Sequence, residues 1–361
     1  MKTILLTTLF LWVSFSACSQ IMLATDETPE QLIQNTFMGQ NLSINSIKFN
    51  GSEANAQVLH DQVARFSNGN AGLSADQGLV LCTGNAAVAL GPNNNDNATF
   101  PTATPFAGDA DLAAISAGTV QNVCIIEFDF IPNGNTVLFE YIFASEEYAS
   151  FANSQFNDTF GLFLSGPGIS GPFTNGGTNI ALIPGTSLPV SINNLNNGTD
   201  NTGPCEYCEF YVNNGTGQTP GINTEVQFDG FTTEFTASGA VVPGQTYHLK
   251  FAIANVGDNA FDSAMFLTAG SFRSTWQLAN EHFTAEKIKM YPNPASDFIR
   301  VSAADHISEA RIYDLQGREL KRVQTGGTDI EINIGDLSSG TYVVTLLLGN
   351  NEMSSQKLVV K

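Results

Sequence analysis

The chain has 361 residues, of which 42% are hydrophobic and 13% charged, and its formal net charge is −20. This length allows two or three domains, and abundant Phe and Gly with little Lys indicate many β-strands joined by turns. With 14 Lys and Arg against 34 Asp and Glu, no basic patch suitable for nucleic acid is expected in the main part of the chain.

Residues 1–19 have the pattern of a signal peptide. Lys2 supplies the positive charge, an apolar segment follows, and small residues allow cleavage before Gln20. A lipoprotein signal with Cys18 as the acylated residue is the alternative. No later segment is apolar over the length that a membrane-spanning helix needs. The sequence therefore predicts Sec export to the periplasm.

The first elements after the signal are short. "TPEQLIQNTFMG" predicts a helix capped by Thr28, and "LSINSIKFNG" predicts a strand that stops at Asn50 and Gly51. "GLVLCTG" predicts a buried strand between glycines, and "GDADLAAISAG" predicts one or two helical turns. The region begins as strands with minor helical additions.

A long series of strand patterns follows as far as Phe272. They are "CIIEFDFIP", "TVLFEYIFAS", "TFGLFLSGPG", "NIALIPG", "TEVQFDGFTTEFTAS", "QTYHLKFAIANVG" and "SAMFLTAGSF". Many strands separated by turn clusters predict a large, jelly-roll-like β-sandwich domain. His248 alternates on one of these strands, and we expect a packed or surface residue there rather than a ligand.

Charge divides the chain in two. Residues 21–285 contain 24 acidic and four basic residues, whereas residues 286–361 contain ten acidic and nine basic residues. Between Phe66 and Leu249 there is no Lys or Arg, although sixteen Asp and Glu occur there. This change in composition predicts a large domain over 20–273, a linker over 274–289 and a small domain over 290–361.

The large domain resembles the choice-of-anchor L domain. The resemblance rests on "FEYIFASEEYASFANSQFNDTFGLFLSGPG" and "LKFAIANVGDNAFDSAMFLTAGSF", with "TPEQL", "GLVLCTG" and "GDADL" in the expected order. It covers about Thr28 to Phe272. The resemblance implies an extracellular or cell-surface domain and no particular reaction.

Oxygen-bearing side chains collect at predicted strand ends of this domain. Because strand ends converge at the edges of a sandwich, we expect them to form a calcium site, with a solvated acidic surface as the alternative. Glu146 and Glu147 are strand neighbours that point to opposite faces, so one of them could be excluded. The predicted metal ligands are Glu146, Glu147, Asn157, Asp158, Asp258 and Asp262.

A carboxylate pair of a glycoside hydrolase is a different interpretation of the same residues. Glu146 with Asp158 or Asp262 could supply the two groups, which must flank a cleft. The chain has no nucleophile elbow and no phosphate-binding loop. These absences favour a non-catalytic protein.

Four cysteines remain after cleavage of the signal peptide, and an even number in an exported chain indicates disulfides. The spacing favours a loop disulfide between Cys205 and Cys208, with a redox-active pair as the alternative. We also expect a second bridge between Cys82 and Cys124. A structural zinc site is disfavoured because there is no second C-x-x-C pair.

The small domain shows short alternating strands with turns, which predicts an immunoglobulin-like β-sandwich. It resembles the type A C-terminal sorting domain of the type IX secretion system. The main residues of the resemblance are Tyr291, Pro292, Asn293, Pro294, Gly317, Arg318, Gly340, Tyr342, Lys357 and Lys361. It implies delivery through the outer membrane by the type IX machinery, followed by removal of this domain and attachment to surface polysaccharide or release.

The sequence thus predicts an all-β, exported, cell-surface or released protein. Adhesion, or binding to a glycan or matrix ligand, is the favoured function. A secreted hydrolase and a structural surface component are the alternatives.

Overall fold

The computed structural model describes residues 20–55, 59–67, 69, 72–103, 105–106, 108–116, 118–217, 226–276, 288–314, 318–348 and 353–361. The predicted signal peptide (1–19), residues 277–287 of the predicted linker and Gly317 lie outside these residues. The chain divides into two compact units, Met1–Gln277 and Leu278–Lys361. Within the described part, no helix is both long and apolar enough to cross a bilayer.

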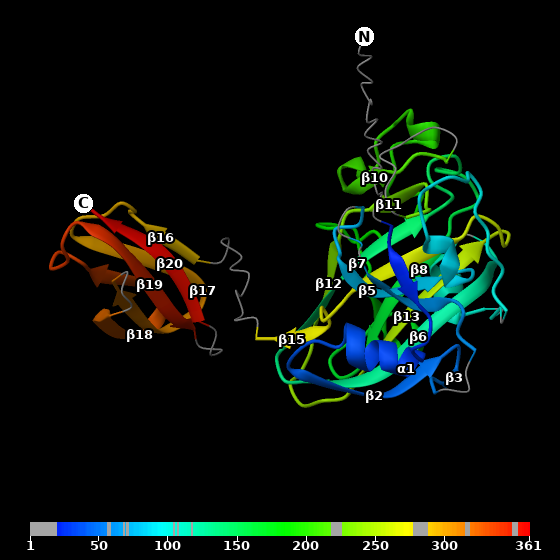
Figure 1. The fold of residues 1–361 in the computed structure, drawn as a ribbon. Coiled ribbons are helices and arrows are strands. Elements are labelled where there is room, and N and C mark those ends of the chain that lie inside the picture. Colours follow the sequence, from blue (N-terminus) through cyan, green and yellow to red (C-terminus); the bar gives the residue numbers. More distant parts are fainter. Residues whose placement is uncertain are drawn as a thin grey trace, which may run out of the picture. The chain divides into compact units, whose positions relative to one another are not determined.

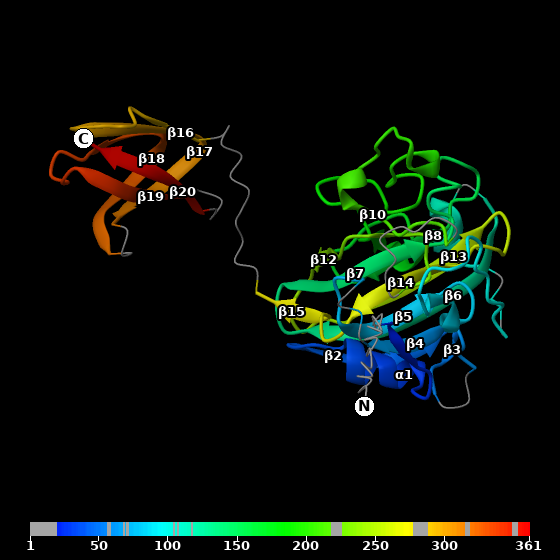
Figure 2. The same ribbon diagram turned by 45° about the horizontal axis from the view of Figure 1, so that its top comes forward.

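The first unit is a sandwich of two sheets whose paired strands are antiparallel (Figures 1 and 2). In the described residues the first sheet has the strands β1 (Met22–Ala24), β4 (Val63–Ser67), β5 (Gln77–Cys82), β14 (Ser263–Thr268), β7 (Thr136–Ser145), β11 (Gly230–Thr232) and β10 (Tyr211–Asn213) in that order, while β12 (Phe235–Ala240) and β15 (Arg273–Thr275) also pair with β7. The second sheet has the order β3 (Ser52–Glu53), β2 (Leu42–Phe49), β6 (Val120–Pro132), β13 (Tyr247–Val256), β8 (Thr159–Ser165) and β9 (Thr178–Asn179). The all-β prediction is confirmed.

The helices are short, and their caps agree with the sequence patterns. They are α1 (Pro29–Gln31), which continues as the π-helix Leu32–Phe37, α2 (Ala110–Ile115), and the 3₁₀ turns Ala86–Ala89, Thr174–Gly176, Thr199–Asn201 and Cys208–Phe210. Thr28 and Gln31 form a reciprocal capping box, in which each side chain accepts a hydrogen bond from the other's backbone N–H. The Asp109 carboxylate accepts hydrogen bonds from the backbone N–H groups of Asp111 and Leu112, which starts α2.

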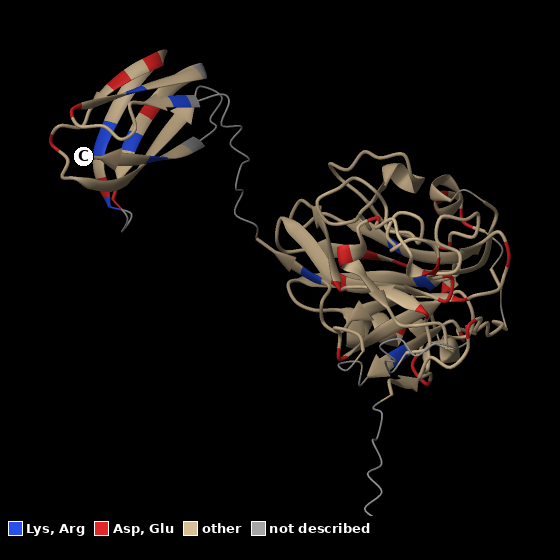
Figure 3. Ribbon diagram, turned by 90° about the horizontal axis from the view of Figure 1, so that it is seen from above, with Lys and Arg blue, Asp and Glu red and all other residues tan. Residues whose placement is uncertain are grey.

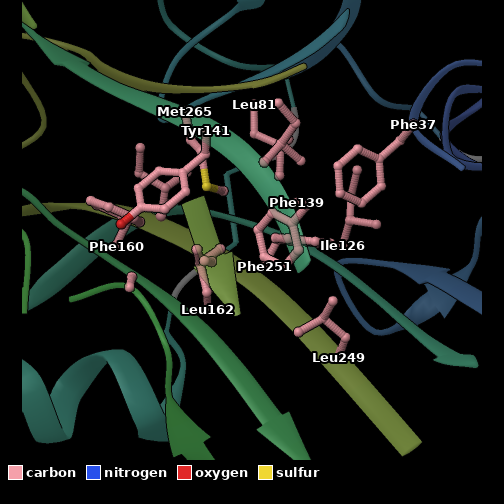
Figure 4. Packing of buried hydrophobic residues seen from close by; sticks show 14 of the residues in the cluster. Phe37, Leu81, Ile126, Phe139, Tyr141, Phe160, Leu162, Leu249, Phe251 and Met265 are labelled. Atoms are coloured by element: carbon pink, nitrogen blue, oxygen red, sulfur yellow. The ribbon is translucent and has the colours of Figure 1, made fainter. Parts of the chain in front are cut away.

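Aromatic side chains fill the space between the two sheets (Figure 4). Phe139 of β7 and Phe251 of β13 face each other across the sandwich, with ring centroids 5.2 Å apart in an edge-to-face arrangement. Phe37 packs against both rings and stacks on Phe272. Such contacts add to the large apolar area that each ring removes from water, and they explain why this low-charge chain uses so much Phe.

Parts of both sheets are also covered on their outer faces. Cys82, Ile142 and Phe266 belong to a second hydrophobic cluster, on the outer side of the first sheet. Leu112 of α2 and Ile125 of β6 belong to another, on the outer side of the second sheet. Burial on two faces explains why several predicted strands are almost continuously apolar rather than strictly alternating.

One predicted strand is much shorter than expected. In "NIALIPG" the ladder ends with β9 at Asn179, because the Asn179 side-chain oxygen accepts hydrogen bonds from the backbone N–H groups of Leu162 and Ala181. Pro184 has no N–H group to extend the ladder. The segment is a loop over much of its length.

In the residues that the structure describes, the second unit is a five-stranded sheet around its own apolar core. Its strands are β16 (Ile288–Tyr291), β17 (Phe298–Tyr313), β18 (Glu319–Asn333), β19 (Gly340–Leu348) and β20 (Met353–Val360). The long strand β17 pairs with β16, β18 and β19, so it holds most of the unit together. Ile299, Ile312 and Leu358 are among the fully buried side chains of this core.

Candidate functional site

Three strands of the first sheet bring carboxylates to one place. Ser145, the last residue of β7, lies opposite Ser263 of β14 and opposite Gly230 of β11. Glu146 follows Ser145, Asp262 precedes Ser263 and Asp229 precedes Gly230, so this register alone makes the three acidic residues neighbours. Asp158 precedes β8 of the second sheet, and Glu147 accepts a hydrogen bond from its backbone N–H (3.3 Å).

We call Glu146, Glu147, Asp158, Asp229 and Asp262 the strand-end acidic cluster. Each of the five has a relative exposure of 1% or less. The described ion pairs of the large domain involve other carboxylates, such as those of Asp109 and Glu140. Figure 3 shows how few blue segments the large domain contains among its red ones. Burying several carboxyl groups without a Lys or Arg partner requires that they be protonated, hydrogen-bonded or bound to a metal cation.

The cluster has two groups, because Glu146 and Glu147 meet different partners. Glu146 lies with Asp229 and Asp262. Its Oε2 accepts a hydrogen bond from the Ala98 backbone N–H (3.3 Å), whereas its Oε1 is buried without a hydrogen-bond partner among the described residues. Asp262 accepts hydrogen bonds from the Phe100 N–H (2.6 Å) and the Thr83 hydroxyl (3.2 Å).

The second group centres on Asp158. Its carboxylate accepts hydrogen bonds from the Val256 N–H (2.9 Å) and from the Ser263 hydroxyl (2.6 Å). The Ser263 hydroxyl also lies 2.8 Å from the Ser145 hydroxyl, so it connects β7, β14 and the start of β8. The nearby Asn255 has a buried side-chain oxygen without a partner in the described residues.

Burial shifts the protonation of these groups upward. Desolvation, with the neighbouring Asp229, raises the pKa of Glu146 from 4.5 to about 10. Desolvation also raises the pKa of Glu147 to about 8, that of Asp229 to about 7 and that of Asp262 to about 6. The pKa of Asp158 is raised by desolvation and by Glu147. In the metal-free protein, several of these carboxyl groups therefore keep a proton near pH 7.

Two predicted metal ligands lie outside the strand-end acidic cluster. Asp258 is half-buried and accepts a hydrogen bond from the Ala260 N–H in its own turn (2.9 Å). Its charge still affects the cluster, because it adds to the rise in the pKa of Glu147 that desolvation mainly causes. Asn157 accepts a hydrogen bond from the Asn193 N–H (2.9 Å). Asp229 was absent from the predicted set. Its position just before a glycine-initiated strand is the sequence signal that could have identified it.

The carboxylates are close but do not form a ready cage. Among the described residues, no three of them bring oxygen atoms within 4.8 Å of one another. The described group that meets this distance is Cys205, Cys208 and Glu209, but both of its sulfur atoms are in a disulfide. A cation at the strand-end acidic cluster would have to draw the carboxylates together and use neutral oxygen atoms as well.

The cysteine predictions had different outcomes. The Cys205–Cys208 disulfide is present, as expected. The second bridge was a wrong prediction, because Cys82 and Cys124 are both free and buried. Cys82 packs in the cluster outside the first sheet, whereas Cys124 faces the core between the sheets. The two side chains therefore belong to different layers.

The predicted sorting residues connect the two ends of the small domain. The Asn293 side-chain amide donates to the Lys357 carbonyl (2.7 Å), and its oxygen accepts from the Val359 N–H (2.9 Å). The Lys361 N–H donates to the Ala295 carbonyl (2.9 Å). The segment after β16 is thus fastened to the last strand.

The other sorting residues are placed on turns and strand ends. Tyr291 ends β16, Pro292 and Pro294 flank Asn293, Gly340 begins β19, the Tyr342 hydroxyl donates to the Ser338 carbonyl (2.6 Å), and Arg318 binds the Asp314 carboxylate (3.0 Å). These are local structural contacts of the small domain.

Family comparisons account for nearly all of the chain after residue 19. Residues 20–273 match the choice-of-anchor L domain, and residues 289–361 match the secretion system C-terminal sorting domain. The second match means that the protein is exported through the type IX secretion system, to be secreted or attached at the outer-membrane surface.

Two curated relatives share a short stretch with this chain. It is 33% identical over 75 residues to β-agarase D of Zobellia galactanivorans and 34% identical over 80 residues to an endo-acting ulvan lyase of Formosa agariphila. Each match covers 21% of this chain, and the chain spans 15% of the length of either relative. Such a stretch is too short to include the large domain.

Similarity to solved structures is low. PorZ of Porphyromonas gingivalis, a surface component of the type IX secretion system, aligns with a TM-score of 0.18 and 17% identity over 30% of this chain and 14% of its own. A polysaccharide lyase aligns with a TM-score of 0.19 and 8% identity over 67% of this chain and 34% of its own. Neither alignment supports a functional argument.

Proposed function

The chain belongs to the choice-of-anchor L domain family, and we propose that its large domain is a non-catalytic binding module for an extracellular glycan or matrix ligand, stabilised by calcium. The supporting observation is the strand-end acidic cluster. It holds five buried carboxyl groups without a described ion pair, and Glu146 Oε1 has no hydrogen-bond partner there.

Calcium fits the chemistry of this cluster. Calcium is coordinated by six to eight carboxylate, carbonyl and amide oxygens in flexible geometry. Carboxylates from the Glu146 group and the Asp158 group could therefore bind it together with neutral atoms such as Asn255 Oδ1. Because the metal-free carboxyl groups retain protons, binding would release protons and strengthen as the pH rises. The ion would connect ends of strands from both sheets.

The hydrolase alternative has no support from the geometry. A glycosidase pair must face a cleft that admits substrate. Glu146, Asp158 and Asp262 have no exposed surface. A substrate could not contact them without opening of the strand ends.

Thermal unfolding of the mature chain with calcium and with chelator tests the calcium proposal. Ion at a hundredfold excess over its dissociation constant should stabilise the large domain by about 2.7 kcal/mol. Asp262→Asn should reduce this gain. The control Asp200→Asn should leave it unchanged, because Asp200 is exposed and Asn tolerates its left-handed backbone (φ 52°). Equal midpoints with calcium and with chelator, at low and moderate salt, would exclude a calcium site.

We further propose that the small domain is removed after passage through the outer membrane and that the large domain is attached to surface polysaccharide or released. Mass spectrometry of the extracellular protein tests this proposal. The expected product lacks residues 289–361, and a heterogeneous added mass would indicate attachment. An extracellular product that retains the small domain in full would contradict it.

A further inference from the structure

A pocket of about 290 Å³ lies on the outer face of the second sheet, and none of the predicted metal ligands lines it. Its floor comes from neighbouring positions of β6, β13 and β8, which Figures 1 and 2 show side by side. Its walls come from the segment that leads into α2 and from the turn at Thr174 and Asn175. The pocket is at the lower end of the size range of small-molecule sites.

One side of the pocket is organised by Lys250. Its ammonium group binds the carboxylates of Asp109 (2.7 Å) and Asp111 (2.6 Å) and lies 5.0 Å from the centre of the Phe163 ring. The Lys250 side chain is 9% exposed. The Asp111 carboxylate is also held by the backbone N–H and the hydroxyl of Thr174 (both 2.8 Å). These contacts fix the charged groups before any ligand arrives.

The other side is organised by His248. Its Nδ1 lies 2.9 Å from the Asp129 carboxylate and its Nε2 lies 3.3 Å from the Glu127 carboxylate. Register explains the arrangement, because His248 pairs with Asp129 on β6 and Lys250 pairs with Glu127. The sequence predicts a surface or packed residue at His248, and the structure adds that this residue lines a pocket.

The charges of the pocket select against ionic ligands of either sign. Among the residues that line the pocket, the three carboxylates of Asp109, Asp111 and Glu127 outnumber the basic groups of Lys250 and His248, so an anionic ligand would be repelled. A cationic ligand would meet Lys250, which already occupies the place over the Phe163 ring. A neutral ligand with several hydroxyl groups can donate to carboxylates, accept from the ammonium and amide groups, and pack against Phe106.

We propose that this pocket binds one uncharged sugar unit of an extracellular polysaccharide. The inference rests on the proposed binding function, for which it names the ligand class, but it does not require calcium. Fixed polar groups beside aromatic rings suit a sugar, whose ring has both apolar faces and hydroxyl edges. The pocket holds a single unit, and the rest of the polysaccharide would extend over the outer face of the sheet.

Calorimetric titration of the mature chain tests this proposal. The neutral probes are hexasaccharides of cellulose, laminarin, mannan and agarose, and the charged probes are a hexagalacturonate and a chitosan hexamer. We expect one-to-one binding of at least one neutral probe and none of the charged probes. Binding of no neutral probe, or equally tight binding of a charged one, would overturn the proposal.

Variants locate the binding to the pocket. Glu127→Gln removes one charge and Asn175→Gly removes an amide while keeping the left-handed backbone (φ 57°), and each should weaken binding at least tenfold. The control Asn45→Ala lies on the adjacent strand β2, opposite Asp129 but outside the pocket lining, and should leave affinity unchanged. Circular dichroism confirms that each variant is folded. Unchanged affinity in both pocket variants would place the sugar elsewhere.

The same titrations with calcium and with chelator separate the two proposals. Sugar binding that persists in chelator, without thermal stabilisation by calcium, would overturn the calcium proposal alone. Binding of a matrix protein by a chain that binds no neutral sugar would keep the binding function and overturn the pocket's assignment.

Discussion

Glu146→Gln gives a direct measure of how the strand-end acidic cluster is protonated. Because the folded-state pKa of Glu146 is raised from 4.5 to about 10, the folded chain holds a proton that the unfolded chain has lost between these values. Stability from this group is fully present below pH 4.5 and is lost as the pH rises toward 10. Each pH unit in this window costs about 1.4 kcal/mol.

The predicted difference between variant and wild type follows from this slope. From pH 6 to pH 8 the metal-free wild type should lose up to about 2.7 kcal/mol through Glu146. The Gln variant lacks this titration, so its stability should fall by that much less over the same interval. If the new amide group lowers stability by the same amount at every pH, this effect cancels, because the comparison is between the changes in unfolding free energy with pH.

Urea unfolding in chelator, followed by near-ultraviolet circular dichroism, provides the assay. Tyr141, Tyr148 and Tyr247 are buried in the large domain, so loss of their fixed surroundings on unfolding changes the signal. The control Glu206→Gln changes an exposed carboxyl group and should keep the wild-type slope. If Glu146→Gln and wild type lose the same free energy from pH 6 to pH 8, Glu146 is ionised in the fold and the reasoning fails.

Three further predictions concern other parts of the chain. Deletion of residues 289–361 should leave the large domain folded in the periplasm, and wild-type surface levels on cell fractionation would contradict this. Alkylation without reductant should label no cysteine in the native protein, because Cys82 and Cys124 are buried and the other pair is bridged. After denaturation it should label Cys82 and Cys124 alone. Label on Cys205 or Cys208, detected by mass spectrometry, would refute this prediction. Lys250→Met should lower the free energy of unfolding in urea by about 3–5 kcal/mol, because Asp109 and Asp111 lose their buried partner. Arg65→Met removes a more exposed ion pair and should lower it by about 1 kcal/mol or less. Equal losses in the two variants would contradict this prediction.

Local chemistry was readable in the sequence. The cap at Thr28, the end of β2 just before Asn50 and Gly51, and the disulfide of the Cys205-x-x-Cys208 loop each depend on a few adjacent residues, so their patterns predicted them correctly. The succession of strand segments along the chain and the sorting pattern of the small domain can likewise be recognised from residues close together in the sequence. These features gave the all-β class and the export route.

Tertiary structure decided everything that depends on layers. A strand buried on both faces has no polar side to show which residues face which way, so the sequence could not tell that Cys82 and Cys124 pack in different hydrophobic clusters. Asp229 joins the strand-end acidic cluster because β11 pairs with β7 across some 85 residues of chain, and the Lys250 pocket exists because α2 covers the second sheet. Such contacts follow from which distant strands pair with each other, and the pattern within one strand does not specify its partner.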